Sequence, residues 1–334
     1  MSSLLLAAAA FSCAATAADP VQRDAFAAGP DIYSRFTLSR DNAPPASYYI
    51  SSPRRKAPLV LYIQGSGCTP VFFERGGQNL STVFSLVTLA HAGQHAVMVV
   101  EKPFAPATPP DESRAALGCP KAYNDYFALG TWLATVKHAV RHALSLPAVD
   151  PQRVLVIGIS EGATVAAALA RDMPEVSAVA LIGGSGPTQL YDFVATIYRS
   201  GGDDAEKARQ LRELDDSVAR INRTPDSTDA FEWGHTHRRW SSFFRESSAN
   251  NLSQSRARIY LASGMADQNV PILSTEVMAA QLRAQGRDIT FRRVPFAGHA
   301  LTRDKAPLQD LQKEFDAIMA WFNGTGSADP VAPQ

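Results

Sequence analysis

The fold is decided by the stretch Val154-Leu155-Val156-Ile157-Gly158-Ile159-Ser160-Glu161-Gly162-Ala163. Its apolar start, Val154 to Ile157, is typical of a strand buried on both faces of a sheet. The strand runs into Gly-x-Ser-x-Gly, and small residues then open a helix. A serine at so sharp a turn needs neighbours without bulk, because strand and helix must approach closely. The pattern therefore predicts that Ser160 is a nucleophile raised above one edge of the sheet.

Apolar runs of the same kind recur on both sides of this stretch. They predict buried strands at 58–63, 96–100, 178–182, 259–262 and 289–294, and helix-like stretches lie at 80–92, 123–146, 162–171, 274–285 and 308–322. Strands that alternate with amphipathic helices indicate an α/β fold with a doubly wound, mostly parallel sheet. Residues 32–38 and 47–51 alternate in polarity, so we expect them to form an antiparallel edge.

The alternation stops between about residues 184 and 255, where we expect helices at 191–200 and 205–221 but no strand. Inserted between two strands, this segment predicts a helical cap over the carboxyl edge of the sheet. Trp233 and Trp240 lie in its aromatic part and are candidate substrate contacts, with packing on the core as the alternative. His235 and His237 form an H-x-H pair without further ligands, so no metal site is predicted.

Composition points to an ordinary globular domain. The chain has 334 residues, of which 46% are hydrophobic, and its 32 basic and 32 acidic side chains cancel. This is enough apolar material for a large core. No basic stretch of the kind that binds nucleic acid stands out, and peripheral membrane contact is not expected.

The N-terminus predicts export. A short apolar block from Leu4 to Phe11 precedes an Ala15-Thr16-Ala17 cleavage pattern, which is typical of a secretory signal. We expect a signal peptide at 1–18, removed near Ala18, and a single domain at 19–334 in the periplasm or outside the cell. The start lacks the usual positive charge, so a non-cleaved N-terminal segment of a cytosolic protein stays open.

Cleavage near Ala18 would leave two cysteines, Cys68 and Cys119. An even pair in an oxidising compartment is a candidate disulfide. Both residues fall in predicted loops that could meet. Two unconnected thiols are the alternative.

The motifs together resemble those of the α/β-hydrolase superfamily. The family's triad runs in the order serine, acid, histidine. Gly264, Asp267, Val270 and Pro271 match its acid loop, and Gly298 and His299 match its histidine loop. The resemblance, which covers about residues 55 to 322 without the cap, implies that His299 is the general base for Ser160 and that Asp267 orients it.

The resemblance also implies an oxyanion hole. One donor is expected to be the amide of Glu161, at the start of the helix after Ser160. The other is expected from the loop Gln64-Gly65-Ser66-Gly67, which stands where the family has His-Gly-x-Gly. Ser66 and Gly67 are the candidates, and Gln64, a departure from the family's histidine, is a candidate substrate contact.

Structural roles compete with each of these assignments. Ser160 could be a helix N-cap, Asp267 a turn residue and His299 a structural histidine. The side chain of Glu161 could attract a substrate amine, but an ionic partner in the cap or near Glu101-Lys102 is the favoured interpretation.

We therefore expect a serine hydrolase that cleaves a carboxylic ester without metal or organic cofactor, acting on a small ester or a short peptide. A serine peptidase of the prolyl-oligopeptidase or aminopeptidase type is the first alternative. A non-catalytic binding protein of the same fold is an alternative of another class. Thioester hydrolysis ranks lower for an exported chain. The oligomeric state is left open.

Overall fold

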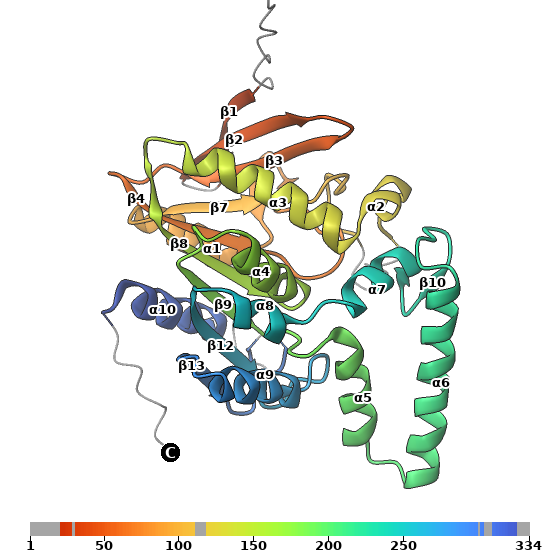
Figure 1. Cartoon of the computed structure of the whole chain (residues 1–334). Helices are drawn as coiled ribbons and strands as arrows, with labels where there is room; N and C mark the ends of the chain where they lie inside the picture. Colours follow the sequence, from red (N-terminus) through yellow and green to blue (C-terminus); the bar gives the residue numbers. More distant parts are fainter. Residues whose placement is uncertain (1–20, 29–30, 111–117, 300, 304–308, 326–334) are drawn as a thin grey trace, which may run out of the picture.

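The computed structural model describes residues 21–28, 31–110, 118–299, 301–303 and 309–325, so the expected signal peptide lies outside the described residues. A nine-stranded sheet forms the centre (Figure 1). Its strands, in spatial order, are β1 (Val21–Ala28), β2 (Asp31–Arg40), β3 (Ala43–Ser51), β7 (Ala96–Val100), β4 (Ala57–Ile63), β8 (Val149–Ile159), β9 (Ala178–Ile182), β12 (Arg258–Gly264) and β13 (Ile289–Val294).

The sheet is mostly parallel, as the alternation of strands and helices predicted. Strands β7, β4, β8, β9, β12 and β13 pair in parallel. Strand β1 pairs antiparallel with β2, β2 with β3, and β3 with β7, which confirms the antiparallel edge. Strand β1 was not predicted, because the stretch Val21–Ala28 is mostly exposed and carries little apolar alternation.

Helices cover both faces of the sheet. One face carries α3 (Leu129–Leu144), α4 (Glu161–Asp172), α8 (Ser248–Gln254) and α9 (Ile272–Ala284), and the other carries α1 (Phe84–Ala92) and α10 (Gln309–Asn323). Strand β4 supplies both cores, since Leu59 and Leu61 face the first layer and Val60 and Tyr62 face the second. None of the helices in the described part of the chain is long and apolar enough to cross a membrane.

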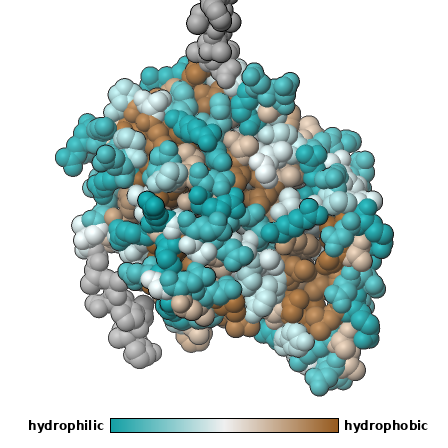
Figure 2. All heavy atoms as spheres, in the orientation of Figure 1, coloured by the Kyte–Doolittle hydropathy of each residue, from teal (hydrophilic) through white to brown (hydrophobic). Residues whose placement is uncertain are grey.

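The segment between β9 and β12 rises beyond the sheet. It contains α5 (Gln189–Arg199), α6 (Asp204–Arg223), the short strands β10 (Phe231–Glu232) and β11 (His235–Thr236), and α7 (His237–Phe244). In Figure 1, α5 and α6 project as a hairpin away from the body, and Figure 2 shows apolar surface over this region. Helix α8 packs on α4 and α9 instead, so the projecting part ends before the expected limit at 255.

Three local expectations were wrong. Residues 78–81 form β6 (Gln78–Ser81), which pairs with β5 (Phe72–Arg75), so α1 begins only at Phe84. The single helix expected at 123–146 is split into α2 (Lys121–Tyr126) and α3, because Phe127 and Ala128 are extended. The expectation of no strand in the inserted segment is corrected by the pair β10 and β11.

The predicted disulfide is present. Cys68 and Cys119 are joined over a sequence separation of 51 residues, with their Cα atoms 5.8 Å apart. Cys68 is fully buried and directly follows the Gly65–Gly67 loop after β4. The bond therefore ties the loop that borders Ser160 to the chain segment that precedes α2.

We expect the double substitution Cys68→Ser/Cys119→Ser to lower the free energy of unfolding by about 2–4 kcal/mol, because it frees a long loop in the unfolded chain. Urea unfolding of both proteins under oxidising conditions measures the difference. Unfolding of the wild type in a reducing agent is the matched control and is expected to give the same loss. Equal stability of all three samples would contradict the prediction.

Candidate active site

Ser160 lies at a strained turn between β8 and α4. Its backbone angles, φ 57° and ψ −124°, fall in a region that non-glycine residues rarely adopt. The Ser160 amide donates to the Ile182 carbonyl at 2.9 Å, which fixes the turn to the carboxyl end of β9. The serine is thereby held at the edge of the sheet where parallel strands end.

The glycines of the Gly-x-Ser-x-Gly pattern permit this turn. A Cβ atom at Gly158 would lie 2.3 Å from the Gly162 carbonyl oxygen, and one at Gly162 would lie 2.3 Å from the Ile63 carbonyl oxygen. Both distances are shorter than any real contact of a Cβ atom, so a side chain at either position would push α4 away from β8 or β4. The absence of bulk that the sequence pattern implied is therefore a steric requirement.

The loops after β12 and β13 are joined backbone to backbone. The Ala266 amide donates to the Ala297 carbonyl at 2.9 Å, and the Met265 amide donates to the Val294 carbonyl at 2.9 Å. A Cβ atom at Gly264 would lie 2.3 Å from the Ala297 carbonyl oxygen. This close contact brings the acid loop against the histidine loop.

Asp267 and His299 meet as a result. The His299 Nδ1 lies 2.8 Å from Asp267 Oδ2. Asp267 is fully buried, and its Oδ1 accepts the amides of Asn269 and Val270 at 2.8 and 3.0 Å. A carboxylate held in this way fixes the orientation of the imidazole and favours the tautomer with the proton on Nδ1, which leaves Nε2 as the base.

Ser160 and His299 both lie next to the C-terminal end of β9. Ser160 is bonded to Ile182, and a Cβ atom at the next residue, Gly183, would lie 3.3 Å from His299 Nδ1. Within the part of the chain that the structure describes, Ser160 Oγ makes no side-chain hydrogen bond to His299. Catalytic hydrogen bonds are often open in enzymes without substrate, so this open geometry is compatible with a serine–histidine pair.

The loop after β4 borders the nucleophile. A Cβ atom at Gly65 would lie 3.3 Å from Ser160 Cβ, and Ser66 lines the same cavity as Ser160 and Glu161. The Glu161 amide belongs to the first turn of α4, where amides lack partners within the helix. Ser66 and Glu161 thus both border the cavity at Ser160.

Two other residues of this loop, Gly67 and Gln64, make hydrogen bonds within the protein. The Gly67 carbonyl points into the protein, where it accepts from Lys102 Nζ and from the Tyr123 hydroxyl, both at 2.8 Å. Gln64 is buried and donates to the Thr69 carbonyl at 3.3 Å. Among the described residues, neither lines the cavity at Ser160, so Gln64 does not contact the space for a substrate.

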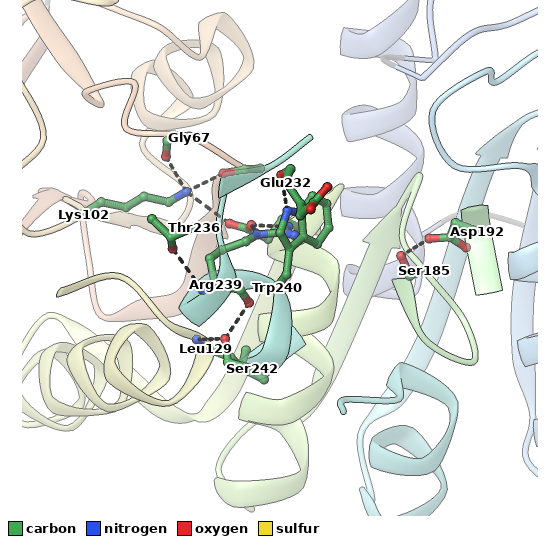
Figure 3. Close-up of polar contacts among 12 residues, drawn as sticks. Gly67, Lys102, Leu129, Ser185, Asp192, Glu232, Thr236, Arg239, Trp240 and Ser242 are labelled. Carbon is green, nitrogen blue, oxygen red and sulfur yellow. Dashed lines mark hydrogen bonds and ion pairs between the residues drawn. The ribbon is translucent and has the colours of Figure 1, made fainter. Parts of the chain in front are cut away.

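Glu161, the residue after Ser160, belongs to a buried ionic cluster with Lys102 and Arg239, which Figure 3 labels. Arg239 of α7 donates through Nε and Nη2 to Glu161 Oε2 at 2.9 and 2.6 Å. Lys102, which follows β7, lies 3.5 Å from Glu161 Oε1 and donates to the Gly65 carbonyl at 2.6 Å. Burial alone would raise the pKa of Glu161, but Arg239 and Lys102 hold it below its ordinary value. Glu161 is therefore a structural partner in this cluster, as favoured from sequence.

The cavity at Ser160 has a volume of about 420 Å³. Residues of α5 and α7 cover it; Phe193, Thr196, Ile197, His235, Arg239 and Trp240 are among those that line it. Trp240 therefore lines the same cavity as Ser160. Trp233 packs on Phe193 and Trp240, with ring centroids 4.6 and 5.5 Å away, and does not itself line the cavity among the described residues. A hollow of about 540 Å³ beside α3 contains no residue of the predicted triad.

Sequence reasoning missed two polar residues of this cavity, Arg239 and Asp192. The signal for Arg239 was a charge inside an aromatic segment, and for Asp192 a carboxylate within a helix that is otherwise apolar on one face. Asp192 of α5 is buried, and its Oδ2 accepts from the Ser185 hydroxyl (Figure 3). Burial raises the pKa of Asp192 to about 6, although hydrogen bonds from Ser185 and Ser274 oppose this.

The fold and the site define an α/β-hydrolase. The chain belongs to the family described as BAAT / acyl-CoA thioester hydrolase C terminal, whose model matches residues 135–331. No curated protein matches the chain.

Solved structures support the same fold. The acetyl xylan esterase of Paenibacillus sp. R4 is similar with a TM-score of 0.59 and 15% identity, over 92% of this chain and 89% of that one. Est1E of Butyrivibrio proteoclasticus has a TM-score of 0.54 and 15% identity, over 87% and 99%. The acylaminoacyl peptidase of Pyrococcus horikoshii has a TM-score of 0.55 and 12% identity over 92% of this chain, which spans only 42% of that peptidase.

The raised pKa of Asp192 predicts how stability depends on pH. The folded carboxyl keeps its proton up to about pH 6, whereas the unfolded one loses it near its ordinary pKa of 3.8. Its contribution to stability is therefore full below pH 3.8 and is lost as the pH rises through about 6. Between these limits, the free energy of unfolding of the wild type should fall by about 1–3 kcal/mol relative to Asp192→Asn, which cannot ionise there.

Urea unfolding of both proteins at several pH values from 4 to 8 measures this difference. Glu175→Gln, a change at an exposed residue between α4 and β9, serves as a control in which no such fall is expected. A constant difference between wild type and Asp192→Asn at every pH would contradict the assignment.

Proposed function

We propose that this hydrolase cleaves a carboxylic ester through an acyl-enzyme formed on Ser160. The observation that carries the proposal is the 2.8 Å contact between His299 Nδ1 and Asp267 Oδ2, at the edge where Ser160 stands on its strained turn. A structural histidine would not need a fully buried carboxylate that already accepts two backbone amides.

In the first half-reaction, Ser160 Oγ attacks the ester carbonyl carbon. His299 Nε2 takes the hydroxyl proton, and Asp267 stabilises the imidazolium that results. The amides of Glu161 and Ser66 receive the negative charge on the carbonyl oxygen, a contribution of several kcal/mol to the barrier. The imidazolium then returns its proton to the alcohol as the ester bond breaks.

In the second half-reaction, water attacks the acyl-enzyme with His299 again as the base. The tetrahedral intermediate uses the same two amides, and the carboxylic acid leaves as Ser160 recovers its proton. The aromatic residues Phe193 and Trp240, which line the cavity, provide an apolar wall for an acyl or alkyl group.

The environment of two carboxylates favours an ester over a peptide with a free amino terminus. The carboxylate of Glu161 is taken by Arg239 and Lys102. The carboxylate of Glu101 accepts the Val71 amide, at 3.0 Å from Oε2. Glu161 is therefore paired within the protein, and Glu101 does not line the cavity at Ser160 among the described residues, so the aminopeptidase alternative loses the residues on which it was based.

A thioester is the second candidate substrate. The family's description names acyl-CoA thioester hydrolases, and a thioester would use the same triad. A purely binding role is the remaining alternative, and the retention of serine, acid and histidine argues against it.

Export stays part of this proposal. The disulfide between Cys68 and Cys119 favours an oxidising compartment, because cytosolic thiols are kept reduced. Removal of residues 1–18 would be seen as a shortened mature N-terminus by mass spectrometry, and a secreted protein that keeps Met1 would argue against it.

The nucleophile can be tested with a fluorophosphonate probe, which reacts with activated serines. We expect the wild type to be labelled on Ser160, and Ser160→Ala to lose both the label and about 10⁴-fold or more of its activity. Ser253→Ala, a serine of α8 that bonds only within its own helix, is the matched control and should keep both. A folded wild type that takes no label would favour the binding role.

The substrate class can be tested with one acyl group in three linkages: a nitrophenyl ester, a coenzyme A thioester and a nitroanilide. We expect the wild type to cleave the ester, and to cleave the nitroanilide no faster than Ser160→Ala does, since an amide carbonyl is less reactive toward a serine nucleophile than an ester carbonyl. A higher kcat/KM for the thioester would select the second candidate. Faster cleavage of the nitroanilide than of the ester would overturn the assignment.

A further inference from the structure

The cluster beside Ser160 is buried. Lys102, Glu161 and Arg239 are 1%, 3% and 4% exposed. The carboxylate of Glu161 faces both cations, and the carboxyl of Glu101 also lies near Lys102. Lys102 Nζ uses its protons on the carbonyls of Gly65 and Gly67 and on Glu161. The hydrogen-bonding capacity that stays open therefore belongs to the guanidinium of Arg239.

One edge of that guanidinium has no partner. Arg239 donates hydrogen bonds from Nε and Nη2 to Glu161. Its Nη1 is buried and makes no hydrogen bond within the described part of the chain. A buried N–H left unpaired costs about 1–3 kcal/mol, and more on a charged group. An anion that accepts a hydrogen bond from this group would remove that cost.

The guanidinium is also fixed in orientation. Its Cζ atom lies 4.0 Å from the centroid of the Trp240 ring and 4.6 Å from that of Phe243. Thr236 caps α7 by accepting the Arg239 amide at 3.1 Å. A planar cation held between aromatic rings is prearranged for a planar carboxylate, which matches its fork of N–H groups.

The other ionisable groups that line the cavity or lie beside it do not neutralise the guanidinium of Arg239. Burial, with Arg239 nearby, lowers the pKa of His235 to about 3, so that ring is neutral at pH 7. Asp267 is paired with His299. Asp192 lines the same cavity, but Figure 3 places it with Ser185 well apart from Arg239. The cavity thus has an acidic end at α5 and a basic end at α7.

Resting on the proposed function, we propose that the guanidinium of Arg239 binds a free carboxylate on the ester substrate, so that the enzyme prefers esters with an anionic group. Arg239 lines the cavity with Ser160 and touches the residue next to it, which puts this subsite within one small molecule's reach of the reacting carbonyl. The carboxylate belongs to the acyl part or to the alcohol part, and the experiment separates the two.

The test compares esters that differ only in charge. For the acyl part, nitrophenyl hemiglutarate is compared with its methyl ester; for the alcohol part, 4-acetoxybenzoate is compared with methyl 4-acetoxybenzoate. In the wild type we expect kcat/KM to be at least about 10-fold higher for the anionic member of one pair, which corresponds to about 1.4 kcal/mol. Equal rates within both pairs would overturn the proposal.

Variants separate recognition from support of the fold. Arg239→Gln should reduce the ratio of kcat/KM for the anionic ester to kcat/KM for the neutral ester to about 1. The double substitution Glu161→Gln/Arg239→Gln should have the same effect, and it removes both charges, so that the carboxylate of Glu161 is not left unpaired. Glu161→Gln alone keeps the guanidinium and should keep or increase the preference. A purely structural arginine would lower both rates of a pair equally and leave their ratio unchanged.

A binding measurement keeps the proposal separate from catalysis. Monomethyl glutarate is titrated calorimetrically into Ser160→Ala, with and without Arg239→Gln, and binding is expected only when Arg239 is present. If the probe does not label Ser160 and no ester is cleaved, the proposed function fails while this titration still decides the subsite. Labelling and cleavage of neutral esters, with no binding of the monoester, would overturn the subsite alone.

Discussion

The structure depends on one close approach, that of the start of α4 to the ends of β4 and β8. Gly158 and Gly162 let the backbones come within a distance that no side chain would allow. The chain must then turn at Ser160 with backbone angles that cost about 1–3 kcal/mol. That strain is sustained because β4 and β8 are buried in the middle of the sheet, between two helical layers. The nucleophile's position is therefore maintained by the whole core.

The second organising feature is the buried cluster of Lys102, Glu161 and Arg239. It connects three separate parts of the chain: the end of β7, the first turn of α4 and the helix α7 of the inserted segment. Lys102 also donates hydrogen bonds to the Gly65 and Gly67 carbonyls, and these bonds fix the loop that borders Ser160. Replacing one member would leave a buried charge without its partner, which makes the inserted segment and the active-site edge energetically dependent on each other.

Most of the body could be predicted from sequence, and the failures have local causes. The parallel strands were found because burial on both faces leaves continuous apolar runs such as 59–63 and 154–157. Strand β1 was missed because its side chains are mostly exposed and its pairing with β2 alone makes it a strand. The break before α3 was missed because Phe127 and Ala128 carry no glycine or proline signal; Phe127 instead leaves the helical path while stacking on Tyr123 at 4.9 Å.

The sequence by itself determined the parallel strands and the turn at Ser160, because these depend on local spacing and on apolar periodicity, and its resemblance to the α/β-hydrolases implied the order of Ser160, Asp267 and His299. Only the tertiary structure decided that Gly67 turns inward, that Gln64 is buried away from the cavity and that Glu161 is paired with Arg239, 78 positions further along the chain. Such pairings depend on how the inserted helices lie over the sheet. No local pattern encodes that placement, since it results from the packing of side chains that are distant in sequence.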